Sequence, residues 1–327
     1  MSIKNHRMVV KLMNKSEKLL RISAFAPIAM LLVLAGCKGT TAQSAAALPS
    51  STAFGQWSQI APGTTVQATG ISAHKTYAAG GDGSVQNIGG GIQGTGGASF
   101  VGAYDNGLNL TILTLQTASG YTFTIDKTAG DTIAAVNVAG SPGAYIGATS
   151  ANNRNSALVT NSPANGWDYQ GFGVWMTGQG VGGTVGAISY GNPSSAVPLA
   201  GTANFSGNAA GVYTNAAGVS AMTTSNMYAN VDFGALTVAF GTSGTMVGNS
   251  SLAKNITAVS PNSSLDMSGT LAISGTQFAG VVQTAGGMTG QSTGQFYGPA
   301  AQEIGGTFTV SGGGVQSLVG AYGGKAH

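Results

Sequence analysis

The chain has 327 residues, of which 54 are glycine, only 6% are charged and one is cysteine. The single cysteine excludes a disulfide within the chain. At roughly 150 residues per domain, the length allows about two domains.

The first 36 residues have the three zones of a secretory signal sequence. Six basic residues and one acidic residue occupy positions 1–21, and an apolar stretch follows at 22–35. This stretch fits the ~7–15 residues of a signal-peptide core and is shorter than the ~20 that a membrane-spanning helix needs. It closes with Leu34-Ala35-Gly36-Cys37, which resembles the lipobox of bacterial lipoproteins, where the cysteine is acylated and the chain is cut before it. We therefore expect a signal peptide at 1–36 and palmitate-type lipidation of Cys37.

Removal of this leader changes the charge of the protein. The mature part keeps six basic residues against eight acidic ones, a net charge of −2, and the basic residues are scattered. Phosphate binding needs clustered lysines and arginines, so no nucleic-acid partner is expected. Lys38 follows the cysteine, where an aspartate would resemble the inner-membrane retention signal, and we therefore expect delivery to the outer membrane.

Beyond a small, polar, flexible tether at 37–53, the dominant hydrophobic period is two. Three runs have apolar residues of one parity: Tyr121, Phe123 and Ile125; Met227, Ala229, Val231 and Phe233; Leu265, Met267, Leu271 and Ile273. Such alternation is typical of antiparallel strands with one face on a core. Between Ile112 and Leu113 the apolar parity switches, which predicts a β-bulge or a strand buried on both faces. Glycine clusters separate the runs and no helical period is sustained, so the predicted fold class is all-β.

An outer-membrane barrel is the competing all-β interpretation. It needs ~9–11-residue strands with an apolar lipid-facing side and aromatic girdles. Many runs in this sequence are shorter than that, and a lipid anchor would be redundant on such a barrel. Lipid-tethered domains outside the bilayer are therefore expected.

Three segments in the second half of the chain carry a more specific pattern. They are Trp-Asp-Tyr-Gln-Gly-Phe-Gly-Val-Trp at 167–175, Gly-Thr-Ala-Asn-Phe-Ser-Gly at 201–207, and Gly-Gln-Phe-Tyr-Gly-Pro-Ala-Ala-Gln-Glu-Ile-Gly-Gly-Thr-Phe at 294–308. This pattern resembles the β-barrel domain of transferrin-binding protein B and its relatives. These relatives include factor H-binding protein, hemophilins and host-colonisation lipoproteins exported through Slam-type translocators. The resemblance covers about residues 167–327, whereas 54–166 show no closely matching motif.

The resemblance implies a β-rich handle domain at 54–191 and a small antiparallel eight-stranded β-barrel at 192–327. It also implies a surface-exposed outer-membrane lipoprotein that binds a host protein or nutrient carrier, or supports host colonisation. A Slam-type outer-membrane translocator is the export partner that the resemblance implies. Two rival functions stay open: a haem-binding lipoprotein for iron acquisition, and a structural or immune-evasive surface protein.

The segment at 294–308 also has a physical interpretation. Proline suits the first position of a helix and glycine can end one in the left-handed region, so the sequence predicts a helical turn at 299–304 that Gly305 terminates. The rings at 296 and 308 and the side chain of Val310 are expected in the barrel core. The whole motif is expected to be structural and not a ligand site. Its members are Phe296, Gly298, Pro299, Glu303, Gly305, Gly306 and Phe308.

The sequence lacks the patterns of common catalytic and metal sites. It has no nucleophile elbow, no zinc-protease motif and no spaced cysteine and histidine cluster. The eight acidic residues of the mature chain stand apart from one another, as is typical of turns and solvated strand positions. Hence no enzyme activity, metal site or obligate cofactor is expected.

His74 is the candidate haem ligand, because neutral imidazole binds haem iron. It lies at 70–83, a glycine-rich stretch that is expected to be a flexible loop, and an exposed histidine without a ligand is the competing interpretation. The resemblance adds that some hemophilin-like relatives hold haem by histidines in this region. Loops on a rigid β-scaffold commonly carry recognition. Four aromatic residues are candidates for exposed loop positions: Trp57, Tyr77, Tyr104 and Tyr145.

Overall fold

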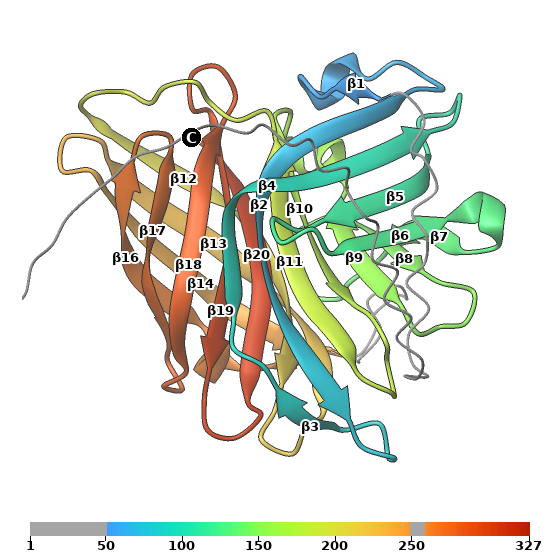
Figure 1. Ribbon diagram of the computed structural model, residues 1–327. Helices are drawn as coiled ribbons and strands as arrows, with labels where there is room; N and C mark the ends of the chain where they lie inside the picture. The colour runs from blue at the N-terminus through green and yellow to red at the C-terminus, as the bar shows by residue number, and fades with distance from the viewer. Residues whose placement is uncertain (1–50, 249–258) are drawn as a thin grey trace, which may run out of the picture. The chain divides into compact units, whose positions relative to one another are not determined.

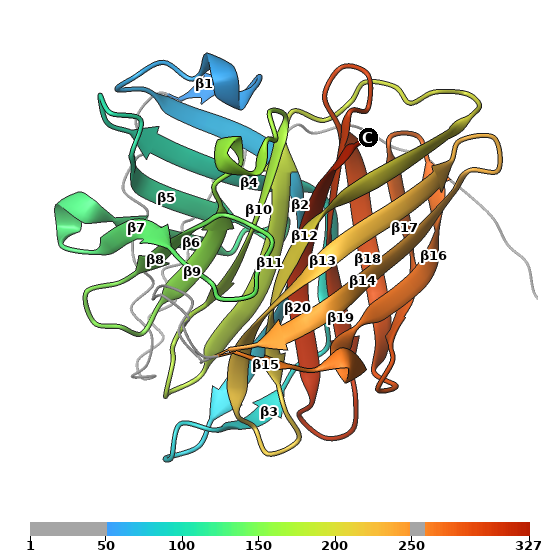
Figure 2. The ribbon, with the colours of Figure 1, turned by 180° about the vertical axis from the view of Figure 1, so that it is seen from behind.

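A computed structural model describes residues 51–248 and 259–327, in which the main regular elements are β-strands (Figure 1 and Figure 2). The all-β prediction is confirmed. Four short 3-10 helices accompany the strands: η1 (Trp57–Gln59), η2 (Lys127–Ala129), η3 (Pro163–Asn165) and η4 (Ser263–Leu265). Within the described ranges, no helix combines the length and the apolar character needed to cross a membrane.

The predicted signal peptide, Cys37 and most of the tether lie outside the described residues. The tether was expected to extend to residue 53, but its last two residues form strand β1 (Thr52–Ala53). This strand pairs in parallel with Val66 and Gln67. The end of the predicted tether is therefore part of the first sheet.

The first sheet is a nearly closed, barrel-like arrangement of nine strands in the order β6-β5-β4-β2-β11-β10-β9-β8-β7, to which β1 and β3 add through β2. Its end strands β6 and β7 are joined through η2, where the backbone N–H of Asp126 donates to Oδ2 of Asp131 at 2.9 Å. The remaining strands are β2 (Thr65–Ala79), β3 (Val85–Ile88), β4 (Ile92–Tyr104), β5 (Leu110–Gln116), β6 (Thr122–Asp126), β7 (Thr132–Val136), β8 (Tyr145–Thr149), β9 (Ser156–Thr160), β10 (Gln170–Met176) and β11 (Gly183–Gly191).

The second sheet is a closed antiparallel barrel of eight strands, as the sequence predicts. Neighbours follow the order β13-β12-β20-β19-β18-β17-β16-β14, and pairing of β13 with β14 closes the ring. A two-residue strand, β15 (Ser260–Pro261), adds to β14. The barrel strands are β12 (Thr202–Thr214), β13 (Ser220–Asp232), β14 (Thr237–Val247), β16 (Met267–Ser274), β17 (Gln277–Thr284), β18 (Thr289–Tyr297), β19 (Glu303–Ser311) and β20 (Ser317–Ala326).

The strand faces predicted from alternation are the observed ones. The apolar residues of the 227–233 and 265–273 runs all lie in the barrel core, while Tyr228 on the opposite parity is 44% exposed. The parity switch in β5 does come from a β-bulge. Ala103 pairs with Ile112, and Tyr104 pairs with Leu110. Thr111 is therefore the extra residue that reverses the side-chain alternation.

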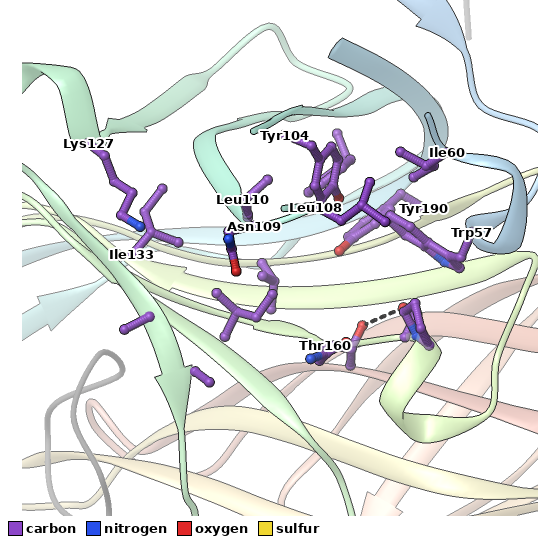
Figure 3. A pocket seen from close by; sticks show the side chains of 18 residues that line it. Trp57, Ile60, Tyr104, Leu108, Asn109, Leu110, Lys127, Ile133, Thr160 and Tyr190 are labelled. Atoms are coloured by element: carbon purple, nitrogen blue, oxygen red, sulfur yellow. Dashed lines mark hydrogen bonds between the residues drawn. The ribbon is translucent and has the colours of Figure 1, made fainter. Parts of the chain in front are cut away.

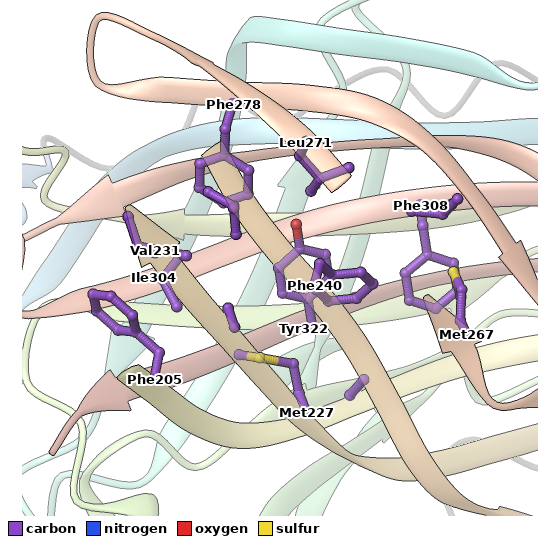
Figure 4. Close-up of a cluster of buried hydrophobic side chains, with 14 of the residues drawn as sticks. Phe205, Met227, Val231, Phe240, Met267, Leu271, Phe278, Ile304, Phe308 and Tyr322 are labelled. Carbon is purple, nitrogen blue, oxygen red and sulfur yellow. The ribbon is translucent and has the colours of Figure 1, made fainter. Parts of the chain in front are cut away.

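The barrel interior is filled by large side chains, including the ring pair Phe240–Tyr322 at 4.4 Å between centroids (Figure 4). Many strand glycines stand directly opposite an aromatic residue of the neighbouring strand. At these positions a Cβ atom would overlap with the ring, so the absence of a side chain makes room for it. The cross-strand pairs in the barrel are Phe278 with Gly294, Phe308 with Gly320 and Tyr322 with Gly306.

Candidate functional site

The motif at 294–308 lies where the barrel meets the first sheet. Phe296 is fully buried in the barrel core, whereas the hydroxyl of the next residue, Tyr297, lies 2.7 Å from Ser189 Oγ of β11. The segment between β11 and β12 also takes part, since Ser194 Oγ donates to the carbonyl of Gly298 at 2.6 Å. Phe308 and Val310 are buried in the barrel core, as the sequence predicts.

The predicted helical turn at 299–304 is wrong. Residues 299 and 300 form a hydrogen-bonded turn, closed by the N–H of Ala301 on the carbonyl of Gly298, and Glu303 already begins strand β19. The left-handed residues here are Gly298 (φ 82°) and Ala301 (φ 55°), and Gly305 is not among them. The alanines locally favour a helix, but the β18–β19 ladder begins directly at this turn and continues along both strands. A turn between antiparallel strands therefore forms here instead of a helix.

Gly305 has a packing role that the sequence did not indicate. A Cβ atom there would lie 2.5 Å from Ser189 Oγ, 3.1 Å from Gln170 Oε1 and 3.1 Å from the Tyr297 ring. Only a glycine lets β19 approach the first sheet this closely. Gly306, the neighbouring residue, faces the Tyr322 ring instead.

Glu303 corrects the expectation that the acidic residues occupy turns and solvated positions. It is 1% exposed, and its two carboxylate oxygens accept backbone N–H bonds from Asp168 at 2.7 Å and Tyr169 at 3.0 Å. Burial raises the pKa of Glu303, while these N–H bonds and the nearby Lys325 act in the opposite direction. The carboxylate thus fastens the segment before β10 to the start of β19.

His74 lies in strand β2 and not in a flexible loop, so that expectation is wrong. It is 6% exposed, and its Nδ1 has no hydrogen-bond partner among the described residues. Burial lowers the pKa of His74, which favours the neutral ring. In the described part of the chain no three His, Cys, Asp or Glu side chains gather in a way that could hold a metal ion. A buried strand histidine gives no support to haem binding through this residue.

The four aromatic residues expected on exposed loops are placed differently. Tyr77 is 7% exposed and donates to the carbonyl of Thr177, and Tyr145 is 2% exposed with its hydroxyl 3.2 Å from Asn208 of the barrel. Both therefore belong to the core between the two sheets. Trp57 and Tyr104 are half-buried and face a cavity inside the first sheet.

This N-terminal cavity has a volume of about 410 Å³ and lies between the β4–β5 side of the first sheet and strands β7, β8 and β9 (Figure 3). Its aromatic wall consists of Trp57, Phe100, Tyr104 and Tyr190, and aliphatic residues that line it include Ile60, Leu110, Ile133, Ile146 and Val159.

Hydrogen bonds hold the aromatic wall in place. Trp57 donates its indole N–H to the carbonyl of Gln170 at 2.9 Å, and its backbone N–H to the carbonyl of Asp168 at 2.8 Å. The rings of Phe100 and Tyr190 stack at 4.2 Å with an interplanar angle of 5°. Trp57 meets this stack edge-on, at 6.1 Å from Phe100 and 6.4 Å from Tyr190.

The mouth of the cavity carries the strained residue Leu108. It occupies the left-handed region (φ 61°) in the turn between β4 and β5 and is 49% exposed. Strained backbone and exposed apolar side chains both concentrate at functional surfaces. Lys127 lines the rim opposite and is exposed (Figure 3).

Sequence reasoning identified two cavity residues, Trp57 and Tyr104, but for the wrong reason. It missed Tyr190, which shares its parity with Ile188 and lies with it in the core of the first sheet. Alternation within β4, β5 and β11 predicts which side chains point inward. Whether inward-pointing side chains fill the interior or leave a cavity depends on sheet closure, which alternation does not encode.

Comparison with protein families matches the second half of the chain. The family described as the C-lobe and N-lobe β-barrels of Tf-binding protein B matches residues 197–326. Residues 197–326 form a transferrin-binding-protein-B-like β-barrel domain. The match starts after the Trp-rich segment at 167–175, which the resemblance includes and which lies in and just before β10 of the first sheet.

Solved structures similar to the chain have low sequence identity with it. A transferrin-binding protein B variant from Haemophilus parasuis has 10% identity and a TM-score of 0.41, with 82% of this chain and 79% of that chain covered. Transferrin-binding protein B from Neisseria meningitidis has 13% identity and a TM-score of 0.39, covering 81% and 77%. A protein described as a surface lipoprotein has 11% identity and a TM-score of 0.37, covering 79% and 98%. No curated protein sequence matches the chain.

Proposed function

We propose that the protein is an outer-membrane lipoprotein, anchored through Cys37 and displayed on the cell surface, which binds a host protein or nutrient carrier. The observation that carries this proposal is the transferrin-binding-protein-B-like barrel at 197–326, in a chain whose residues 34–37 resemble a lipobox. Acyl chains, at ~0.8 kcal/mol per buried methylene, can hold such a protein on a membrane without a spanning helix. A Slam-type translocator is the proposed export partner.

The anchor and the location can be tested together in cells. Clickable palmitate should label the wild type and leave Cys37→Ser unlabelled, because acylation at this position requires a thiol. Protease added to intact cells should degrade the protein only when the translocator is present. Equal labelling of both proteins would refute the anchor, and protection in intact cells would refute surface display.

The first sheet offers a surface for the proposed partner at the β4–β5 turn. Leu108 is exposed, apolar and strained there, and η1 lies beside it at the mouth of the cavity. The barrel holds a matched residue, Leu236, which is 51% exposed with φ 55° in the turn between β13 and β14. The two leucines therefore share their exposure and a left-handed φ but lie in different domains.

The binding test uses the lipid-free fragment 38–327 on host plasma. A captured protein should lose affinity for Leu108→Asp by about tenfold or more and keep its affinity for Leu236→Asp, because an aspartate at an apolar contact would bury an unpaired charge. Equal loss or equal retention for both variants would refute recognition by this turn. Absence of any specific capture would favour the structural surface protein instead.

A further inference from the structure

We propose that the N-terminal cavity is a binding site for a neutral, mainly aromatic small molecule that carries one hydrogen-bonding group. Its volume of about 410 Å³ falls within the ~300–1,000 Å³ typical of small-molecule pockets. The inference does not depend on the proposed protein partner.

The aromatic wall sets the preferred shape of the ligand. The parallel stack of Phe100 and Tyr190 and the perpendicular Trp57 ring surround the cavity on one side. Phe100 and Tyr190 are each only 1% exposed and support the wall from behind. The ring faces open to a ligand are those of the half-buried Trp57 and Tyr104, against which a flat ring can stack or lie edge-on, the favoured geometry for aromatic pairs. Half-buried Ile60 and Ile146 supply aliphatic surface.

The phenol of Tyr104 supplies a polar contact. Tyr104 lines the cavity and is half-buried, whereas Tyr190 is only 1% exposed. Burial raises the pKa of Tyr104, so its phenol is protonated at neutral pH. It can therefore donate to, or accept from, one hydroxyl, carbonyl or amine of a ligand.

The charges near the cavity favour a neutral ligand. Among the described residues that line it, no charged side chain is buried, and Lys127 at the rim is exposed. The charge of Lys127 acts on the carboxylate of Asp105, and Asp126 directly precedes Lys127 in the chain. The rim thus has no net positive charge for an anion, and a buried ion without a partner would be costly.

The test is a fluorescence titration of the lipid-free protein, 38–327, with N-phenyl-1-naphthylamine, a neutral aromatic amine. We expect saturable binding at one site per chain, and at least tenfold weaker binding of the anionic 8-anilinonaphthalene-1-sulfonate. Ile146→Trp should fill the cavity and weaken binding of the neutral probe at least tenfold, whereas Val281→Trp, on an exposed barrel position, should leave it unchanged. Tyr104→Phe should weaken it about two- to tenfold, as expected for one lost hydrogen bond.

Circular dichroism of each variant checks the fold. If Ile146→Trp does not fold, Ala135→Trp at the rim of the same cavity replaces it, with the same expected loss. Equal binding of the two probes, several equivalent sites, or wild-type affinity in the folded tryptophan variant would each overturn the proposal.

Discussion

Gly305 offers a direct test of how β19 packs on the first sheet. A Cβ atom at this position would lie 2.5 Å from Ser189 Oγ, so there is no room for a methyl group. Gly305→Ala therefore forces either the Ser189 side chain or the strand to move. Ser189 also shares a hydrogen bond of 2.7 Å with the Tyr297 hydroxyl, which such a movement would break.

Two costs contribute to the expected destabilisation. An inserted methyl group in a well-packed region costs about 1–3 kcal/mol. Loss of the buried hydrogen bond between Ser189 and Tyr297 adds about 1 kcal/mol. The free energy of unfolding should fall by about 2–4 kcal/mol in total, as long as β19 keeps its register.

The same hairpin provides a matched control. Gly313, in the loop between β19 and β20, has no atom within 4 Å of the position that a Cβ atom would take, and it has no positive φ. Gly313→Ala should be neutral or stabilise the protein by up to about 1 kcal/mol, because it restricts the unfolded chain. Urea unfolding of the lipid-free protein, followed by circular dichroism, measures both changes.

A double variant identifies the atom responsible. Ser189→Ala removes Oγ, so in the Gly305→Ala background it should cost less than it does alone, with a coupling of about 0.5–3 kcal/mol. If Gly305→Ala stays within about 0.5 kcal/mol of the wild type, or the two changes are simply additive, the close approach of β19 to Ser189 does not stabilise the protein.

Three further predictions concern the barrel and its junction. Phe308→Ala should lower the free energy of unfolding by about 3–5 kcal/mol, because the ring is buried in the barrel core, whereas Val281→Ala on the surface should change it by less than about 0.5 kcal/mol; urea unfolding measures both. Because burial raises the pKa of Glu303, its stabilising contribution is complete below the ordinary value of 4.5 and is lost as the pH rises through the raised value. In Glu303→Gln the free energy of unfolding should therefore decline less steeply above pH 4.5 than in the wild type, and an unchanged pH profile would contradict this assignment. A fragment of residues 192–327 should unfold cooperatively in a thermal melt, since the β13–β14 pairing closes the barrel without the first sheet, and a broad, non-cooperative melt would show that the barrel depends on it.

Local sequence pattern alone was enough for the fold class and for much of each strand's orientation. Alternation placed Met227, Val231 and Leu271 in the barrel core, because neighbouring residues in a strand point to opposite sides whatever the tertiary context. It also predicted a bulge or a strand buried on both faces at the parity switch between Ile112 and Leu113, and the structure places a bulge nearby, at Thr111. The motif at 294–308 identified the type of barrel through a resemblance, and the family match over 197–326 agrees with it.

The contacts between segments distant in sequence were decided by the tertiary structure. The sequence predicts that Glu303 is a solvated acid. In the structure it accepts N–H bonds from Asp168 and Tyr169, which lie more than 130 residues earlier in the chain. The sequence predicts that Gly305 ends a helix, whereas in the structure it gives room to the Ser189 side chain. The glycine-rich stretch around His74 was predicted to be a loop, but it forms a strand because β4 and β11 pair with it on both sides. The N-terminal cavity is lined by side chains from β4, β5, β7, β8, β9 and β11, which only the twist and packing of the sheet bring together, and local pattern does not encode this.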